Sequence, residues 1–573
     1  MHNPNRHPYL QFKTPLLYSG MLIADHMDRP TKIPRLLRVT AWLLIPAAFG
    51  VLAIAMGQDA GWDLRNYHFY NPYAFLHGRM DFDMVPAQVA NFYNPLLYVP
   101  FYTMVSHLPP RAVGFLLGAV QGLNFPLLFT IVHHLLTPLH GRKAALFAFV
   151  IALAGVLGAG NISEIGTMSA DNIVSLLILA SILIVLVNSG QLAVERRAGV
   201  IAGVVGAGVM AGLAAGLKQP AVIFAVGLCA AFLAVPASPK RRALYLLWFG
   251  LGVLAGITMT GGYWMYNLWV KFGNPFFPYF NDLFQSPMAT PGSYRDERFL
   301  PRGALEAVFF PVIFAKDPLH TAEIYFRDLR IPLLYGLLIS LALHAFNRLR
   351  APAADRHIAH GPVPSVFGFQ ARYLLAAGVV SYLAWLKLFA IYRYIVVIEM
   401  LAPLGIWLVL SRLLSDRRLR MAAGSMAMLL ILAATRPCIW GRVPWSDDYF
   451  GVTPPALKDP GHTMVLMAGV DPMAYVIPFF PESVRFVRIQ SYFTGPSDKP
   501  NGYDRLMHQL VDQQSGPLYI LYRSYEENAA RAALRAYGLQ LQDSHCLAMR
   551  PHIEAGLKDP LLFCQAMRQE WKE

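Results

Sequence analysis

A polar and aromatic segment follows the first long apolar run, at residues 61–94 (GWDLRNYHFYNPYAFLHGRMDFDMVPAQVANFYN). Its reactive and hydrogen-bonding side chains are Asp63, Arg65, Tyr67, His68, Arg79, Asp81, Asp83 and Gln88. A carboxylate in such company can take a proton from a hydroxyl group as a general base. We predict Asp63 as the catalytic residue because it is the carboxylate of the segment nearest the apolar run. Asp81 and Asp83 remain alternatives, and a metal site built from Asp63 and His68 alone is too small to predict.

The composition shows which class of protein must position this segment. Of the 573 residues, 55% are hydrophobic and only 14% are charged, and the mean hydropathy is +0.41. A soluble protein carries roughly a quarter charged residues, and apolar runs of about 20 residues match the thickness of a bilayer. The net charge of +14 comes from short Lys and Arg clusters between apolar runs. This pattern is typical of cytoplasmic loops, so we predict a multi-pass membrane protein and no nucleic-acid partner.

The apolar runs and basic clusters predict about eleven membrane spans. The N-terminus is then cytoplasmic and the chain after Arg436 lies outside. No cleaved signal peptide is expected, and residues 94–107 are expected to lie in the interface rather than to cross it. The predicted spans are residues 39–57, 112–136, 143–160, 171–188, 198–217, 220–235, 243–265, 331–347, 371–391, 394–411 and 420–435.

The predicted fold is therefore an all-α polytopic membrane protein with a small extracytoplasmic α/β domain at its C-terminus. Its parts are a cytoplasmic segment at residues 1–38, a transmembrane domain at 39–435 and the outer domain at 436–573. Two long outside loops, at about 58–110 and 266–330, interrupt the transmembrane domain. The cytoplasmic residues 351–370 are predicted to form a linker without regular structure.

The C-terminal tail has short apolar runs of strand length that alternate with helical patterns. Cys546 and Cys564 are the two cysteines close in sequence, and a disulfide between them suits an oxidising compartment; two free thiols are the alternative. No known chemical motif appears in the tail. The predicted strands are residues 462–470, 483–489 and 516–523, and the predicted helices are 503–513 and 525–537.

Ionisable residues near membrane depth are costly and tend to mark function. Lys218 lies in a turn between two predicted spans, where its ammonium group can hold a phosphate or extend to the interface. Arg393 lies in a second such turn and is a candidate for the same anion. Asp171 begins a span and is either a helix cap or part of a site. Glu399 lies deeper in a span, which indicates a structural partner.

An acid in the first outside loop, a second long outside loop and an outer tail resemble the GT-C superfamily of membrane glycosyltransferases. The sequences DLRNYHFYNPYAFLHGR, GLKQP and WVKFGNPFFPYFN look like a bacterial branch near the dolichyl-phosphate-mannose and aminoarabinose transferases. The resemblance covers roughly residues 39–435. It implies that Asp63 corresponds to the catalytic acid of the first loop, Lys218 to the lysine after the fifth helix and Arg393 to a phosphate-facing arginine. The chain departs from the pattern because Asp63 stands alone, where many relatives carry an Asp–Glu pair.

The resemblance implies an inverting transfer of a sugar from a polyprenyl phosphate to a glycan, lipid or protein acceptor, at the outer face of a bacterial inner membrane. Asp63 is the base, and no cofactor or metal is predicted. The alternatives are an O-antigen ligase or polymerase, for which the second loop offers Arg295, Arg298, Arg302 and His320, and a transporter of lipid-linked sugars. The predicted substrate-binding residues are Lys218, Arg393, Tyr67, His68 and Asp171.

Overall fold

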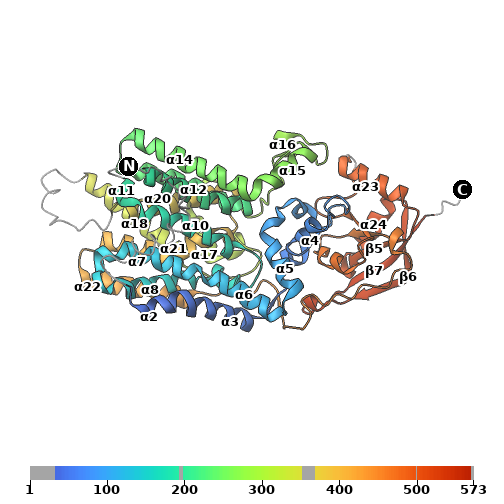
Figure 1. The fold of residues 1–573 in the computed structure, drawn as a ribbon, viewed down its shortest axis with the longest axis horizontal. Helices are drawn as coiled ribbons and strands as arrows, with labels where there is room; N and C mark the ends of the chain where they lie inside the picture. Colours follow the sequence, from blue (N-terminus) through green and yellow to red (C-terminus); the bar gives the residue numbers. More distant parts are fainter. Residues whose placement is uncertain (1–32, 193–197, 351–367, 498–499, 570–573) are drawn as a thin grey trace, which may run out of the picture.

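A long helical bundle is joined at one end to a smaller domain that contains a five-stranded sheet (Figure 1). The computed structural model describes residues 33–192, 198–350, 368–497 and 500–569. Residues 1–32 of the predicted cytoplasmic segment and residues 351–367 of the predicted linker lie outside the described residues. The architecture is mostly helical, as predicted, with its main sheet at the C-terminal end.

Every predicted span coincides with a helix. Within the described residues, six helical stretches are long and apolar enough to cross a membrane, so the count of eleven spans stays a prediction. The six are Arg35–Met56, Pro110–Pro138, Ala198–Leu217, Pro239–Phe272, Arg330–Arg348 and Tyr392–Leu413. The helices of this part are α2 (Arg35–Val39), α3 (Ile45–Met56), α6 (Pro110–Gly122), α7 (Asn124–His140), α8 (Ala144–Val156), α9 (Ala159–Ser163), α10 (Asp171–Val187), α11 (Ser189–Leu192), α12 (Ala198–Leu217), α13 (Val222–Ala230), α14 (Pro239–Ile257), α18 (Arg330–Arg350), α20 (Phe369–Leu388), α21 (Val396–Leu413) and α22 (Arg417–Ala434).

Helices α12 and α14 approach each other closely because glycines line their contact. A Cβ atom on Gly212 would lie 2.1 Å from the carbonyl oxygen of Val253, and one on Gly252 would lie 2.3 Å from that of Val205. Small residues spaced by four allow such backbone contact between helices in lipid, where hydrophobic burial gives no driving force. This packing fixes the position of the C-terminal end of α12, and Lys218 is the next residue.

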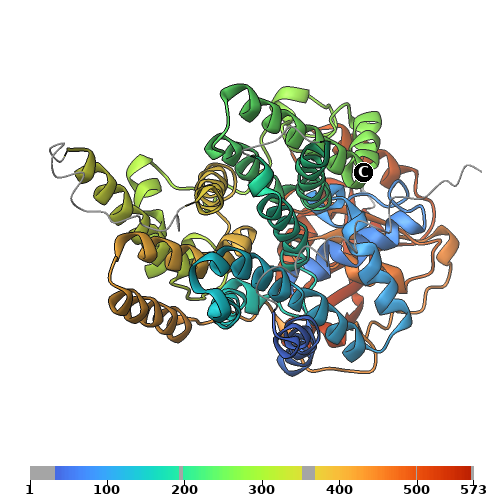
Figure 2. The ribbon, with the colours of Figure 1, turned by 60° about the vertical axis from the view of Figure 1, so that its left-hand side comes forward.

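The two long loops contain short helices rather than spans. The first loop includes α4 (Tyr70–Leu76) and α5 (Val99–His107), which Figure 1 shows between the bundle and the sheet. The second begins as α15 (Tyr263–Phe272), which continues α14, and includes α16 (Asn281–Phe284) and α17 (Ala304–Lys316). Figure 2 shows the blue first loop against the orange and red tail from a second direction. The first loop therefore joins the two parts of the molecule.

The tail has a mixed sheet in the order β4-β3-β5-β7-β6, with α23 (Gly502–Gln513) and α24 (Glu527–Ala536) packed against it. The three predicted strands and two predicted helices are present. The prediction missed β6 and β7, which are antiparallel and extend the sheet beyond β5. The predicted disulfide Cys546–Cys564 joins these two strands. The strands are β3 (Met464–Ala468), β4 (Arg485–Gln490), β5 (Leu518–Arg523), β6 (Leu539–Met549) and β7 (Leu561–Arg568).

The first loop pairs with the exposed edge of this sheet. Met84 forms a parallel bridge with Val487 of β4, and its amide donates to the carbonyl of Phe486 at 2.8 Å. Beside it, Arg79 binds both carboxylate oxygens of Asp83 at 2.8 and 2.9 Å and donates to the carbonyl of Val484 at 2.6 Å. Covering an edge strand in this way satisfies its free backbone groups. The first loop and the tail are thus one packed unit.

We predict that Arg79→Met destabilises this union. The Arg79 and Asp83 side chains are only 5% and 0% exposed, so the substitution leaves Asp83 buried without its cation. Removing one partner of a buried pair costs roughly 3–5 kcal/mol. Thermal unfolding of the purified protein in detergent measures the effect as a lower Tm. Lys271→Met is the control because it breaks the exposed pair with Asp81, which is worth about 1 kcal/mol or less. Equal shifts in both variants would contradict the prediction.

Candidate functional site

The turn that carries Asp63 is held on both sides by hydrogen bonds. Just before it, β1 (Gln58–Asp59) pairs with β2 (Arg442–Val443) in a short antiparallel ladder. The Asp59 carboxylate accepts from the amides of Gly61 at 2.9 Å and Met168 at 3.0 Å. Just after it, the helical turn Leu64–His68 begins. Asp63 therefore projects from a short segment whose backbone is anchored to the bundle and the tail.

Asp63 forms an ion pair with Arg393, with 2.6 Å between its Oδ2 and the Arg393 Nη1. Arg393 lies in the turn Tyr392–Ile395, which leads into α21, and the amide of Tyr392 donates to the carbonyl of Thr321 at 2.8 Å. The two side chains are 22% and 19% exposed. This pair is therefore sheltered but still open to a ligand.

Lys218 and Asp171 form a second ion pair, at 2.7 Å. The Lys218 ammonium also donates to the carbonyl of Ser169 at 2.5 Å. Its nitrogen lies 5.6 Å from the ring centre of Tyr394, and the Arg393 guanidinium carbon lies 5.4 Å from the same ring, so both cations lie near one aromatic ring. Of the two roles considered for Asp171, the helix cap does not fit, since the residue at the N-cap of α10 is Ala170.

Glu164 is a further member of the site that the sequence reasoning missed. It is 1% exposed, and burial together with the neighbouring Asp171 carboxylate raises its pKa well above 4.5. Neither carboxyl oxygen of Glu164 has a hydrogen-bond partner among the described residues. The sequence did offer a signal for Glu164, because it is an acid in the short segment ISEIGTMSADN between two predicted spans, where a buried carboxyl group needs a partner.

Charges are balanced across the group. Asp63 faces Arg393, and Asp171 faces Lys218. Burial alone would raise the pKa of Asp63, but the Arg393 guanidinium and the other neighbouring groups, Lys218 among them, together outweigh burial and lower that pKa below 3.8. Asp63 is therefore an ionised carboxylate at neutral pH and can accept a proton.

Tyr67 and His68 lie in the aromatic group next to Asp63. The ring centres of Tyr67 and His68 are 4.4 Å apart, and His68 stacks on Tyr98, also at 4.4 Å. Burial lowers the pKa of His68 to about 3, so the imidazole is neutral. Neither ring nitrogen of His68 has a hydrogen-bond partner among the described residues. Neutral nitrogens at this position can bind a hydroxyl group but cannot supply charge.

Other ionisable residues from the sequence analysis have structural or surface contacts. Asp83 binds Arg79 and accepts from the Tyr70 hydroxyl at 3.1 Å, while Asp81 forms an exposed pair with Lys271. Glu399 accepts from the amides of Gly160 and Asn161, each at 3.0 Å, which is the structural partnership expected for it. Within the described residues, no group of three or more His, Cys, Asp or Glu side chains could hold a metal ion.

The structure thus brings all six predicted site residues into one region at the end of the bundle that faces the first loop. Asp63 and Arg393 are 330 positions apart in the chain, and Asp171 begins α10 while Lys218 follows the end of α12. The prediction assigned Lys218 and Arg393 to a lipid phosphate and named no carboxylate partner for either. Instead, each is paired with a carboxylate, because an isolated charge is costly at the end of an apolar bundle.

Comparison with known proteins adds little to this geometry. No known family model matches the chain, and no curated protein sequence matches it. One solved structure, ArnT from Cupriavidus metallidurans bound to undecaprenyl phosphate, is similar at 12% identity and a TM-score of 0.42. The match covers 91% of this chain and 98% of that one. A likeness this distant carries no argument about function.

We predict that Arg393→Gln raises the pKa of Asp63. Without the guanidinium, burial dominates, and the carboxyl group becomes protonated at a higher pH than in the wild type. Carbodiimides modify protonated carboxyl groups, so labelling of Asp63 measured by mass spectrometry between acidic and neutral pH reports its titration. The labelling midpoint should move to higher pH in Arg393→Gln and stay unchanged in Lys271→Gln. An unchanged midpoint in Arg393→Gln would show that Arg393 does not control Asp63.

Proposed function

We propose that this protein is a membrane glycosyltransferase that moves a sugar from a polyprenyl phosphate to an acceptor hydroxyl group with inversion. The observation that carries the proposal is the ionised Asp63 beside two cations, Arg393 and Lys218, at the end of an apolar helical bundle. A base for the acceptor and cations for a lipid phosphate are the two requirements of this reaction.

The chemistry needs one displacement. The acceptor oxygen attacks the anomeric carbon of the sugar while the bond from that carbon to the phosphate oxygen breaks. The acceptor proton passes to Asp63, and the bonding electrons leave with the polyprenyl phosphate. A phosphate is a good leaving group, so no second carboxylic acid is needed to protonate it, unlike in a glycoside hydrolase. Lys218 and Arg393 stabilise the charge that develops on the leaving phosphate.

The remaining predicted residues have supporting roles. Asp171 orients Lys218. Tyr67 and the neutral His68 offer hydroxyl and imidazole groups to the sugar beside Asp63. No cofactor takes part in the proposed reaction, and the acceptor is a glycan, a lipid or a protein.

The site is proposed to lie on the outer side of a bacterial inner membrane, with the N-terminus in the cytoplasm. Two observations support this orientation. The Cys546–Cys564 disulfide belongs to the tail that packs on the first loop, and disulfides persist in oxidising compartments. The basic residues Arg142 and Lys143 lie in the turn between α7 and α8, and Arg417 begins α22. Short basic connections of this kind are typical of the cytoplasmic side of a membrane protein.

The ligase alternative has less support from the side-chain contacts. Its candidate cations in the second loop are exposed and engaged locally: Arg295 with Glu297 at 3.0 Å, and Arg298 with Asp296 at 2.6 Å. His320 lies 3.4 Å from Asp317, and that pair is also exposed. Exposed pairs between near neighbours in sequence do not form a sheltered site. No contact among the described residues favours a transporter.

We predict that Asp63→Asn abolishes transfer. The amide cannot accept the proton of the acceptor, and a positioned general base contributes roughly 10²- to 10⁴-fold to the rate. The assay uses purified protein in lipid with a panel of radiolabelled polyprenyl-phosphate sugars. Asp81→Asn is the matched control, because it removes an exposed carboxylate of the same loop and should keep the wild-type rate. Full activity in Asp63→Asn would refute the assignment of the base.

We also predict that Lys218→Gln weakens donor binding. A hydrogen bond to a charged group contributes roughly 1.5–3 kcal/mol, so the KM for the lipid donor should rise about tenfold or more. Lys218→Arg, which keeps the charge, should have a smaller effect. Lys316→Gln removes an exposed cation at the end of α17 and serves as the control. Steady-state kinetics against donor concentration measures the change, and an unaltered KM in Lys218→Gln would remove Lys218 from the phosphate site.

A further inference from the structure

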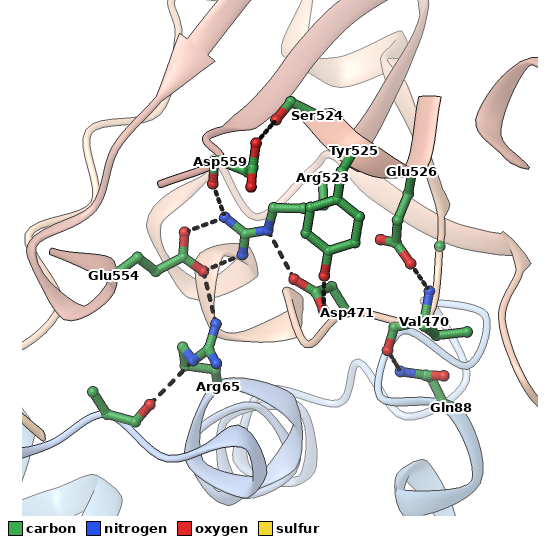
Figure 3. A network of polar contacts seen from close by, with 12 residues as sticks. Arg65, Gln88, Val470, Asp471, Arg523, Ser524, Tyr525, Glu526, Glu554 and Asp559 are labelled. Carbon is green, nitrogen blue, oxygen red and sulfur yellow. Dashed lines mark hydrogen bonds and ion pairs between the residues drawn. The ribbon is translucent and has the colours of Figure 1, made fainter. Parts of the chain in front are cut away.

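A buried network of charged side chains joins the tail to the turn that carries Asp63 (Figure 3). At its centre, Arg523 of β5 donates to both oxygens of Glu554, at 2.5 and 2.7 Å. Glu554 also accepts from Arg65 of the first loop, at 3.2 Å. The three residues are 1%, 6% and 9% exposed, in the order Arg523, Glu554 and Arg65. One carboxylate therefore bridges two arginines from parts of the chain far apart in sequence.

The second arm of the network fixes Arg523 itself. Its Nε donates to Asp471 at 2.9 Å, and the hydroxyl of Tyr525 donates to the other oxygen of Asp471 at 2.6 Å. The backbone carbonyl of Asp559 accepts from Arg523 at 2.9 Å. The Arg523 side chain is only 1% exposed, and a buried charge held by several hydrogen bonds is rigid, because any displacement leaves it without a partner. Arg523 therefore holds Glu554 in one position.

Arg65 transmits this position to the turn before it. Its Nη1 binds Glu554, while its Nε donates back to the carbonyl of Ala60 at 3.2 Å. Asp63 lies between Ala60 and Arg65 in the sequence. The Arg65 guanidinium group thus joins the end of the turn to its start at Ala60. Through Glu554, it also binds the turn to the tail. A second contact supports the same arrangement, since Gln88 of the first loop donates to the carbonyl of Val470 at 2.9 Å, next to Asp471 (Figure 3).

We infer that Glu554 is a positioning residue for Asp63, acting through Arg65, and that the tail is therefore a working part of the active site. This inference rests on the proposed function of Asp63. Glu554 touches neither the reacting atoms nor Arg393 in this arrangement. Its effect is to keep the turn of residues 60–65 where the Asp63 carboxylate meets the Arg393 guanidinium. Displacements of about 1 Å in a reacting group can lower a rate 10²-fold.

The test is a double-mutant cycle on transfer activity with Glu554→Gln, Arg65→Met and the combined variant. Glu554→Gln should lower kcat about tenfold or more while the KM for the donor changes little, because the phosphate-binding cations are unaltered. Arg65→Met should have a similar effect, and adding Glu554→Gln to it should lower kcat no further. Asp559→Asn is the control, since the Asp559 side chain accepts an exposed hydrogen bond from Ser524 and its backbone carbonyl still binds Arg523 after the substitution. Additive losses in the combined variant, or a normal kcat in Glu554→Gln, would overturn the inference.

Hydrogen exchange separates this inference from the proposed function. Amides of residues 61–69 should exchange faster in Glu554→Gln than in the wild type and in Asp559→Asn, whether or not the sugar donors tested are turned over. If the wild type turns over no donor but Glu554→Gln still exchanges faster, the result would support the contact between tail and turn and count against the proposed reaction. Unchanged exchange together with normal kcat in Glu554→Gln, beside an inactive Asp63→Asn, would reject this contact and leave the proposed reaction standing.

Discussion

The ion pair between Asp63 and Arg393 is the contact on which the site depends. Each charge would be costly alone at the end of an apolar bundle, and together they are tolerated. The same holds for Lys218 and Asp171, and the shared Tyr394 ring brings the two pairs together. The bundle supplies three of these four charges from the ends of α10, α12 and α21. The glycine contacts between α12 and α14 and the backbone bond from Tyr392 to Thr321 matter because they set where those ends lie.

The fourth charge, Asp63, comes from the first loop, whose own contacts are too few to fix its conformation. The first loop has only short helices and irregular turns, and isolated helices of such length are marginal in water. Its order comes from the tail, through the bridge of Met84 to β4 and the buried pair of Arg79 and Asp83. The sheet also benefits, since β4 would otherwise present a free edge. Loop and tail thus stabilise each other, and the position of Asp63 relative to the bundle depends on both.

The sequence predicted the helix positions well, because runs of apolar residues reflect a local requirement of the bilayer. It also singled out Asp63, Lys218, Arg393 and Asp171, since a charge in an apolar context stands out without any knowledge of its partner. The partners themselves were not predictable, because 330 positions separate Asp63 from Arg393 and 489 separate Arg65 from Glu554. Strand β6 was missed for a different reason. Its sequence LQLQDSHCLAM is broken by polar residues, and its pairing with β7 is irregular between Leu541 and Cys546.

Arg393 and Lys218 are each paired with a carboxylate before the donor binds, and this affects the first step of the proposed reaction. The donor is a phosphodiester with one negative charge on two free oxygens, the same number as a carboxylate, so in the proposed reaction it competes with Asp63 and Asp171 for Arg393 and Lys218. When it binds, Arg393 and Lys218 turn part of their hydrogen bonding toward it. Asp63 then loses some of the interaction that lowers its pKa, and its burial raises that pKa. The carboxylate therefore becomes a better base when the donor is bound. In the empty site, the same carboxylate is held by Arg393 and is a poor base toward water or a stray hydroxyl group. Substrate binding and base activation are in this way one electrostatic event.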